Sequence, residues 1–380
     1  MKKTTLLSMA LTMATMAFAQ TLPAGYTQTI ENGRAVLRDA TGEIMAWLDQ
    51  PIDNQDIPAE FINFLDFHEE GLRRINAGAM EEDVYLTKSV RNAKSSAAKA
   101  PAATPDTIGP LLGNIRYHQS APYNNNCPNK AVTGCVATAM SQIMCYYHYP
   151  DCGTGSAKYT TLSGETTFNF DTHPFDWDLI KDNYEGSFTN AQAAAVANLC
   201  LAAGAAVNMN YSRDGSGANS EDVAPAMKTY FGFSEDATFV SSTKPDYEND
   251  WIYTLEEDLD NGYPIYYAGS QGTSFTGHAF LIDGYTISDT GTTNVQRYWF
   301  HLNWGWGGSM NGYYRINKLQ PETDNYSGYR NEMIFSLYPA NMTDIEGVTT
   351  TYTASKKIEN GQIIIEKNGK RYSVVGTLVK

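Results

Sequence analysis

Hydrophobic residues recur every three or four positions in two long stretches of the chain, which is the period of an α-helix. The first stretch begins at Cys135, and a glycine precedes it. Its apolar face comprises Val136, Met140, Ile143, Met144 and Tyr147. The second is an alanine-rich run that predicts a buried helix from Asn190 to Asn208.

Farther along the chain the apolar residues come in short runs of the length and type found in strands. These runs are Tyr263 to Ala268, His278 to Tyr285, Tyr298 to Asn303, Tyr313 to Ile316 and Met333 to Tyr338. Helices that come first and strands that follow predict an α+β domain with two segregated halves. Its aromatic and glycine-rich composition sets the boundaries of this domain at about residues 107–340.

Residues 20–106 form a different unit. Strand-like runs at Arg34 to Leu37 and Glu43 to Leu48 precede a helical pattern from Phe61 to Ile75. Small residues, prolines and isolated basic residues then fill positions 87–107, a composition typical of an exposed, protease-accessible linker. We interpret the unit as a pro-segment on a cleavable linker; the alternative is an ordinary interdomain linker.

The two ends of the chain have compositions of their own. Residues 1–19 combine Lys2-Lys3, an apolar run and a small-residue ending, a pattern typical of a secretory signal peptide; a short buried helix is the alternative. The apolar run is too short to span a bilayer, and no later stretch is long and apolar enough. Residues 341–380 end in a basic segment with turns at Asn360-Gly361 and Asn368-Gly369 around a strand, which predicts a small β appendage.

Charge and cysteine content narrow the function further. The net charge of −15 argues against binding to nucleic acid or to anionic membranes. Five cysteines are an odd number for an exported chain, so at least one thiol is unpaired. A disulfide between Cys127 and Cys152 stays open, and no group of cysteines and histidines has the spacing of a zinc site.

The order cysteine, histidine, asparagine suggests thiol-protease chemistry. His278 follows Cys135 after 143 residues (278 − 135), within the roughly 130–150 typical of papain-like enzymes. A helix N-terminus favours the thiolate form of Cys135, and Gly134 allows the sharp turn into the helix. Cys145 and Cys200 lie within apolar helices, so we expect both to be structural.

His278 is the best of six histidines for the general base, because it stands at the start of an apolar strand directly after a glycine. Asn303 would accept a hydrogen bond from the ring N–H of His278, and Trp304 would shield that bond from water. Asp283 is the competing orienting group, and we expect His301 to be a packing residue. The Cys135 amide needs a second donor for an oxyanion hole, and Gln119 is the candidate.

These motifs together resemble the streptopain family of bacterial cysteine proteases, which includes interpain-like enzymes. The resemblance rests on Gly134 to Ala139 with Gln142-Ile143-Met144, on Gly277 to Phe280 with Asp283-Gly284-Tyr285, and on Asn303 to Gly308. The segment with Gln119 is similar to the stretch that supplies the oxyanion glutamine. Residues 341–380 resemble a type IX secretion sorting domain.

The resemblance implies a papain-like two-lobed fold, a Cys135–His278 dyad and no cofactor or metal. It implies protein or peptide substrates with a hydrophobic side chain at the second residue before the scissile bond. It also places Ser216 and Gly277 where family members contact the substrate backbone. It further implies that the enzyme's own pro-domain inhibits it by displacing the histidine. We therefore expect a secreted or cell-surface cysteine endopeptidase made as a zymogen and monomeric when mature. An acyl-transferase or amidase, and an inactive binding or adhesion protein on the same scaffold, are the alternatives.

Overall fold

The computed structural model describes most of the chain between residues 21 and 373. The described residues are 21–52, 57–58, 61–62, 65, 107–161, 164–213, 215–242, 250–271, 277–288, 291–316, 329–342, 355–359, 362–367 and 370–373. The predicted signal peptide and the predicted linker before residue 107 lie outside these residues. Within them, no helix is both long and apolar enough to cross a membrane.

A ten-stranded antiparallel sheet forms one half of the molecule. Its strands run in the order β1-β2-β3-β11-β10-β9-β8-β12-β7, with β4 paired to β9. The bounds are β1 Thr27–Glu31, β2 Arg34–Arg38, β3 Ile44–Leu48, β4 Thr107–Ile108, β7 Thr238–Ser242, β8 Ile265–Gln271, β9 Gly277–Ile287, β10 Tyr298–Asn303, β11 Gly312–Tyr314 and β12 Tyr329–Phe335. The predicted strands of the later half all appear here.

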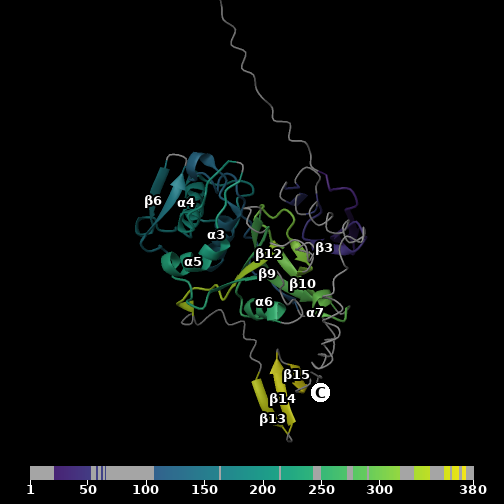
Figure 1. The fold of residues 1–380 in the computed structure, drawn as a ribbon. Coiled ribbons are helices and arrows are strands. Elements are labelled where there is room, and N and C mark those ends of the chain that lie inside the picture. Colours follow the sequence, from purple (N-terminus) through teal and green to yellow (C-terminus); the bar gives the residue numbers. More distant parts are fainter. Residues whose placement is uncertain are drawn as a thin grey trace, which may run out of the picture.

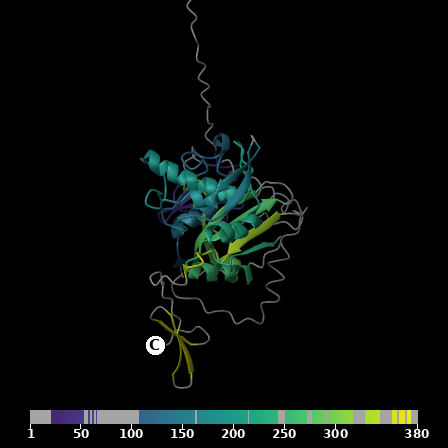
Figure 2. The same ribbon diagram turned by 90° about the vertical axis from the view of Figure 1, so that its left-hand side faces the viewer.

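Helices dominate the other half. They are α3 Cys135–Tyr147, α4 Asn190–Ala206 and α5 Val223–Phe231. A 3-10 turn precedes each of them along the chain: η2 Pro128–Lys130, η3 Phe170–Thr172 and η4 Ser220–Asp222. A hairpin of β5 Ser156–Thr161 and β6 Gly164–Asn169 lies beside α4. Two further helices, α6 Asp250–Asp260 and α7 Asn294–Arg297, belong to the strand half. Figures 1 and 2 show teal helices on one side of the molecule and green strands on the other, as the α+β prediction requires.

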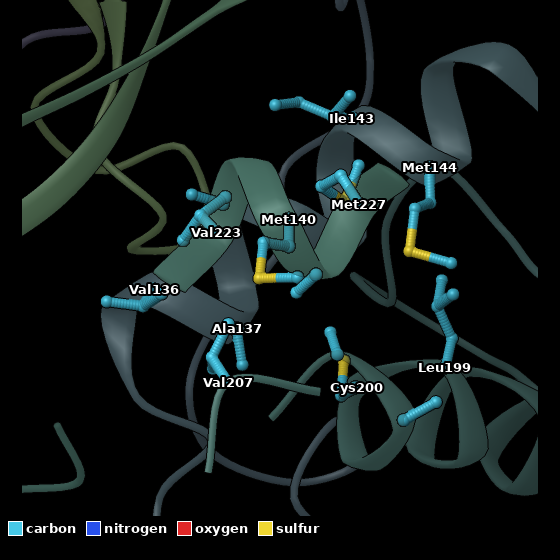
Figure 3. Close-up of a cluster of buried hydrophobic side chains, with 14 of the residues drawn as sticks. Val136, Ala137, Met140, Ile143, Met144, Leu199, Cys200, Val207, Val223 and Met227 are labelled. Carbon is cyan, nitrogen blue, oxygen red and sulfur yellow. The ribbon is translucent and has the colours of Figure 1, made fainter. Parts of the chain in front are cut away.

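Helix α3 is the central element of the helical half. It packs on α4 and on β9, and Figure 3 shows apolar side chains from α3, α4 and α5 converging in one cluster. The predicted apolar face is buried apart from Tyr147, but so is every residue from Val136 to Cys145. The sequence predicted one buried face, whereas the structure buries α3 on several sides, because neighbouring elements surround it.

The N-terminal strands extend the sheet of the strand half. β3 pairs antiparallel with β11, and Trp47 lies opposite Tyr313. The Trp47 and Trp299 rings stack with centroids 4.2 Å apart. Phe61 and Leu65 are buried with the core residues of this sheet, and only the start of the predicted helix from Phe61 to Ile75 lies in the described residues. The N-terminal segment and the strand half therefore share one hydrophobic core.

The C-terminal strands form a separate three-stranded sheet. Its members are β13 Ser355–Glu359, β14 Gln362–Lys367 and β15 Lys370–Ser373. The β14 strand matches the predicted strand between the two Asn-Gly turns, and Figure 1 draws this sheet in yellow.

Candidate active site

Cys135 is the first residue of α3, and its position depends on Gly134. Gly134 has φ +85°, a conformation that residues with a side chain rarely adopt. A Cβ at Gly134 would lie 2.8 Å from Ser216 O and 2.8 Å from Met209 Sδ. Only glycine fits this turn, which places the half-buried Cys135 at the N-terminus of the helix. The unpaired N–H groups there favour a thiolate and a developing oxyanion.

The other four cysteines lack this environment. Burial raises the pKa of the Cys127 and Cys145 thiols to about 12 and raises that of Cys200 further. Cys152 donates a hydrogen bond through its thiol to Phe170 O at 3.3 Å. All five cysteines are free, so the disulfide that the sequence left open between Cys127 and Cys152 is not formed in this structure.

Ser216 lies beside the turn that precedes Cys135. Its hydroxyl donates to Val132 O at 2.6 Å and accepts from Ser212 N at 3.0 Å. The side chain is therefore engaged in holding the loop against the nucleophile turn. A contact with substrate remains a prediction, and it would come through the Ser216 backbone, which borders Gly134.

His278 stands at the start of β9, paired with Gly269 of β8. Its ring stacks on Trp306 with centroids 4.6 Å apart, and Nε2 lies 2.8 Å from Trp304 O. A carbonyl oxygen only accepts, so Nε2 carries the proton and Nδ1 is the basic nitrogen of the neutral ring. Gly277, the predicted substrate contact, is the exposed first residue of β9 and pairs with Ser270 of β8.

The geometry around Asn303 differs from the prediction. Its Nδ2 donates to Ile115 O at 2.8 Å, and its Oδ1 accepts from Gly305 N at 3.2 Å. In this structure the acceptor at the ring N–H of His278 is the Trp304 backbone, and Asn303 fixes the neighbouring chain. A direct catalytic role for Asn303 therefore stays a prediction.

Trp304 is buried next to His278, with ring centroids 6.0 Å apart, and its role in shielding a bond of the histidine ring stays a prediction. Sequence reasoning missed Trp306 as the ring that stacks on the histidine. The signal was its position two residues after Trp304, which allows the two indoles to stack on each other at 5.1 Å.

Gln119 lies on a segment that reaches the nucleophile turn. Its backbone oxygen accepts from Thr133 N at 3.0 Å, two residues before Cys135. Tyr117, two residues earlier, donates its N–H to the Gln142 side chain of α3 and accepts from Gly307 N at 2.8 Å. The structure thus brings the Gln119 backbone to the nucleophile turn, and the oxyanion role of its side chain remains a prediction.

Comparison with known proteins identifies the family to which this chain belongs. The sequence profile described as the Peptidase C10 family matches residues 117–314, just over half of the chain, from the Gln119 segment through β11. The chain belongs to the peptidase C10 family. Streptopain of Streptococcus pyogenes is 29% identical over 290 residues, which cover 68% of this chain and 70% of that protein. The thiol protease/hemagglutinin PrtT of Porphyromonas gingivalis is 31% identical over 240 residues, 59% of this chain and 26% of that protein.

Solved structures agree with this assignment to the peptidase C10 family. A fragment of Prevotella intermedia prointerpain A, a mutant, is 28% identical with a TM-score of 0.62, covering 85% of this chain and 98% of that one. Active interpain A of the same organism is 34% identical with a TM-score of 0.52, covering 62% of this chain and all of that one. The chain is thus a cysteine-type peptidase with an α+β papain-like fold, which confirms both predictions.

In this member of the peptidase C10 family, a buried histidine joins the N-terminal segment to the strand half. His301 Nδ1 lies 2.5 Å from Asp283 Oδ1, and Nε2 lies 3.0 Å from Asp49 Oδ2. Asp283 therefore serves His301 and does not orient His278, and His301 is an ion-pairing residue where we expected simple packing. Burial lowers the pKa of His301, but the charges and hydrogen bonds of Asp283 and Asp49 outweigh it and raise the pKa to about 10.

The N-terminal segment also reaches the tryptophans beside His278. The Phe61 ring meets Trp304 and Trp306 edge-on, with centroid distances of 6.0 Å and 6.1 Å. Phe61 is fully buried in this position. Edge-to-face aromatic pairs are favourable beyond the area that they bury, so this contact couples the segment to the rings that hold the histidine.

Proposed function

We propose that the chain is the zymogen of a secreted cysteine endopeptidase with a Cys135–His278 dyad. The observation that carries the proposal is the position of Cys135: a half-buried cysteine outside any disulfide, at the start of α3, directly after a glycine that no other residue could replace. Membership of the peptidase C10 family supports a nucleophilic role for this thiol. Burial raises the thiol pKa of Cys127, Cys145 and Cys200. The Cys152 thiol donates a hydrogen bond to a backbone carbonyl.

In the proposed reaction His278 first takes the proton of the Cys135 thiol on its basic nitrogen, and the resulting thiolate attacks the scissile carbonyl carbon. The oxyanion that forms accepts hydrogen bonds from the Cys135 amide and from Gln119. His278 gives a proton to the leaving amine as the C–N bond breaks, which leaves an acyl-enzyme. His278 then takes a proton from a water molecule, whose oxygen attacks the thioester and releases the acid and the thiol. The Trp304 carbonyl keeps the imidazole in the tautomer that this cycle uses.

The N-terminal segment is the proposed inhibitor of the precursor. Three contacts support this role: the pairing of β3 with β11, the His301–Asp49 bond, and the packing of Phe61 on the tryptophans beside His278. The similarity to a prointerpain fragment over 85% of this chain agrees with a precursor. Cleavage between the segment and residue 107 would then free the enzyme.

Secretion is part of the proposal because of the two ends of the chain. Residues 1–19 have the pattern of a signal peptide, and residues 341–380 resemble a type IX sorting domain. We expect the mature, monomeric enzyme at residues 107–340 to act on protein substrates outside the cell.

The experiment that tests the proposal compares the chain from Gln20 to Lys380 with its Cys135→Ala variant. Both are incubated under reducing conditions, and cleavage is followed by mass spectrometry together with casein hydrolysis. The proposal expects cleavage within residues 87–107 and casein hydrolysis only in the wild type. If an added protease removes the segment and the wild type still fails to hydrolyse casein, the protein is an inactive binder. Turnover of the acyl-enzyme that is slow until an amine acceptor is added, with the new amide as product, would instead indicate an acyl-transferase.

A further inference from the structure

We propose that Gln142 is a positioning residue that keeps Gln119 in register with the Cys135 amide. The inference rests on the proposed function, because it assumes that these two groups form the oxyanion hole. Gln142 belongs to the helix that carries the nucleophile, seven residues after Cys135, which is about two turns and roughly 10 Å along the axis. Its side chain is fully buried, with 0% of its surface exposed.

The side chain of Gln142 ties α3 to the segment that carries Gln119. Gln142 Oε1 accepts from Tyr117 N at 3.0 Å, and Gln119 follows two residues later, roughly 7 Å along an extended chain. Gln119 is held on its far side by the bond from Thr133 N to its backbone oxygen. The backbone of Gln119 is thus fixed between two bonds, one from within α3 and one from the turn that leads into α3.

Two further bonds reach this segment from residues 303–308. Asn303 Nδ2 donates to Ile115 O at 2.8 Å, and Gly307 N donates to Tyr117 O at 2.8 Å. Those two bonds fix the segment relative to Trp304 and Trp306, the residues that pack on His278. Two side-chain contacts relate it to the helix of the nucleophile: the Gln142 bond to the Tyr117 backbone, and a hydrogen bond between the Tyr117 hydroxyl and the Cys145 thiol. Of these, the Gln142 bond is the one that fixes the backbone of the segment. Both donors of the oxyanion hole would therefore take their positions from α3.

The side-chain amide of Gln142 provides one useful acceptor, Oε1, but its NH₂ group lowers the stability of the fold. Its Nε2 is buried with no hydrogen-bond partner among the described residues, and an unpaired buried donor is destabilising. A leucine or methionine would fill the same space without that unpaired donor, but it would leave the Tyr117 N–H unpaired. The value of glutamine here lies in the Oε1 bond to Tyr117.

A double-mutant cycle separates a positioning role from a packing role. The variants are Gln142→Leu, Gln142→Met and Gln142→Glu, each made in the full-length chain with wild-type Gln119 and with Gln119→Ala. Ser141→Ala is the matched control, because the Ser141 hydroxyl is buried in the same helix and bonds Ala137 O at 2.7 Å. Activated enzyme is quantified by titration of the reactive thiol, and kcat and KM are measured on one peptide substrate.

We expect Gln142→Leu and Gln142→Met to lower kcat about tenfold with KM within about twofold, because a small misplacement of a catalytic group costs rate more than binding. Gln142→Glu keeps an oxygen acceptor and should retain at least about half of the wild-type kcat. In the Gln119→Ala background the same substitutions should change kcat less than about twofold, since no donor is left to position. The rate of Cys135 alkylation by iodoacetamide should stay unchanged throughout.

Equal losses of kcat in both Gln119 backgrounds would overturn the inference and leave Gln142 as a packing residue. A Gln142→Leu variant that does not fold leaves the methionine and glutamate variants to decide, since both preserve the volume of the side chain. An active wild type in which Gln119→Ala has no effect would also sink the inference while the dyad stands. An inactive wild type would instead contradict the proposed function.

Discussion

His301 and Asp49 are 252 residues apart in the chain, yet His301 Nε2 lies 3.0 Å from Asp49 Oδ2. The histidine is buried on β10, and the aspartate follows β3 of the N-terminal segment. Asp283, buried on β9, holds the other ring nitrogen. A single imidazole therefore carries a bond between the proposed pro-segment and the catalytic sheet.

The first prediction concerns alkaline pH. Because the folded-state pKa of His301 is raised from 6.5 to about 10, its bonds stabilise the fold fully below about pH 6.5 and are lost as pH rises through 10. In a Cys135→Ala background, the free energy of unfolding in urea should fall by at least about 1 kcal/mol between pH 7 and pH 9.5. Tyr313, edge-on to His301 at 5.0 Å, has its pKa raised to about 12 and stays neutral in this window.

His301→Gln is the control for this measurement, since other groups also titrate between pH 7 and pH 9.5. The variant should be less stable at pH 7 and should show a shallower fall with pH than the parent. Parallel pH profiles for the two proteins would contradict the assignment of the charge to His301.

The second prediction compares the two carboxylates at His301. The Asp49 side chain is 42% exposed, so Asp49→Asn should cost less than about 1 kcal/mol. Asp283 is 1% exposed and also accepts from Leu112 N at 3.1 Å, so Asp283→Asn should cost about 3–5 kcal/mol. Urea denaturation of both variants in the Cys135→Ala background measures the difference.

Only Asp49 lies in the N-terminal segment, so Asp49→Asn should also speed the release of that segment after linker cleavage. Glu31→Gln is the matched control, because it removes an ion pair to Arg38 that stays within the segment. Size-exclusion chromatography of cleaved protein measures release. Equal release rates for the two variants would show that the bond between Asp49 and His301 does not hold the N-terminal segment in place.

The third prediction concerns Phe61. Phe61→Ala removes the ring that packs on Trp304 and Trp306, and loss of a buried phenylalanine costs about 3–5 kcal/mol. We expect the uncleaved variant to hydrolyse a small peptide substrate that the uncleaved wild type does not. Linker cleavage has to be blocked by substitutions in residues 87–107. Leu65→Ala, a buried change in the same core, should have a smaller effect on this activity.

The fourth prediction tests the turn at Gly134. Gly134→Ala forces a Cβ into Ser216 O and requires a positive φ, so activity should fall at least about 100-fold as the thiol is displaced. Gly155→Ala is the control: it has φ +71° but no atom within 4 Å of an added Cβ. That substitution should cost about 1–2 kcal/mol and leave kcat unchanged. A comparable loss of kcat in both variants would contradict the steric argument.

Local patterns explain how much of the fold could be predicted. The strand Tyr298–Asn303 and the helix that starts at Cys135 match their predictions because apolar spacing sets the element directly. Helix α6 was missed although Trp251, Ile252, Leu255 and Leu259 are buried at helical spacing. The β5–β6 hairpin was also missed, since its polar strands show only a weak alternation.

Long-range contacts explain what was out of reach. Every residue of β10 is buried, so His301 needs polar partners, but nothing local reveals that Asp49 would be one of them. The predicted bond from Asn303 to His278 failed to appear for a similar reason. The choice between a side-chain amide and the adjacent Trp304 carbonyl depends on where Ile115 lies, and Ile115 is 188 residues from Asn303.

The central claim is that Cys135 is the nucleophile, and selective alkylation tests it most directly. Activated enzyme is treated with about one equivalent of iodoacetamide, residual activity is recorded, and the modified cysteine is located by peptide mass mapping. Cys152 is the internal comparison, because it too forms no disulfide and is only half-buried. We predict that Cys135 is modified first and that activity falls in proportion to its modification. Loss of activity that follows Cys152, or full activity with Cys135 alkylated, would contradict the account.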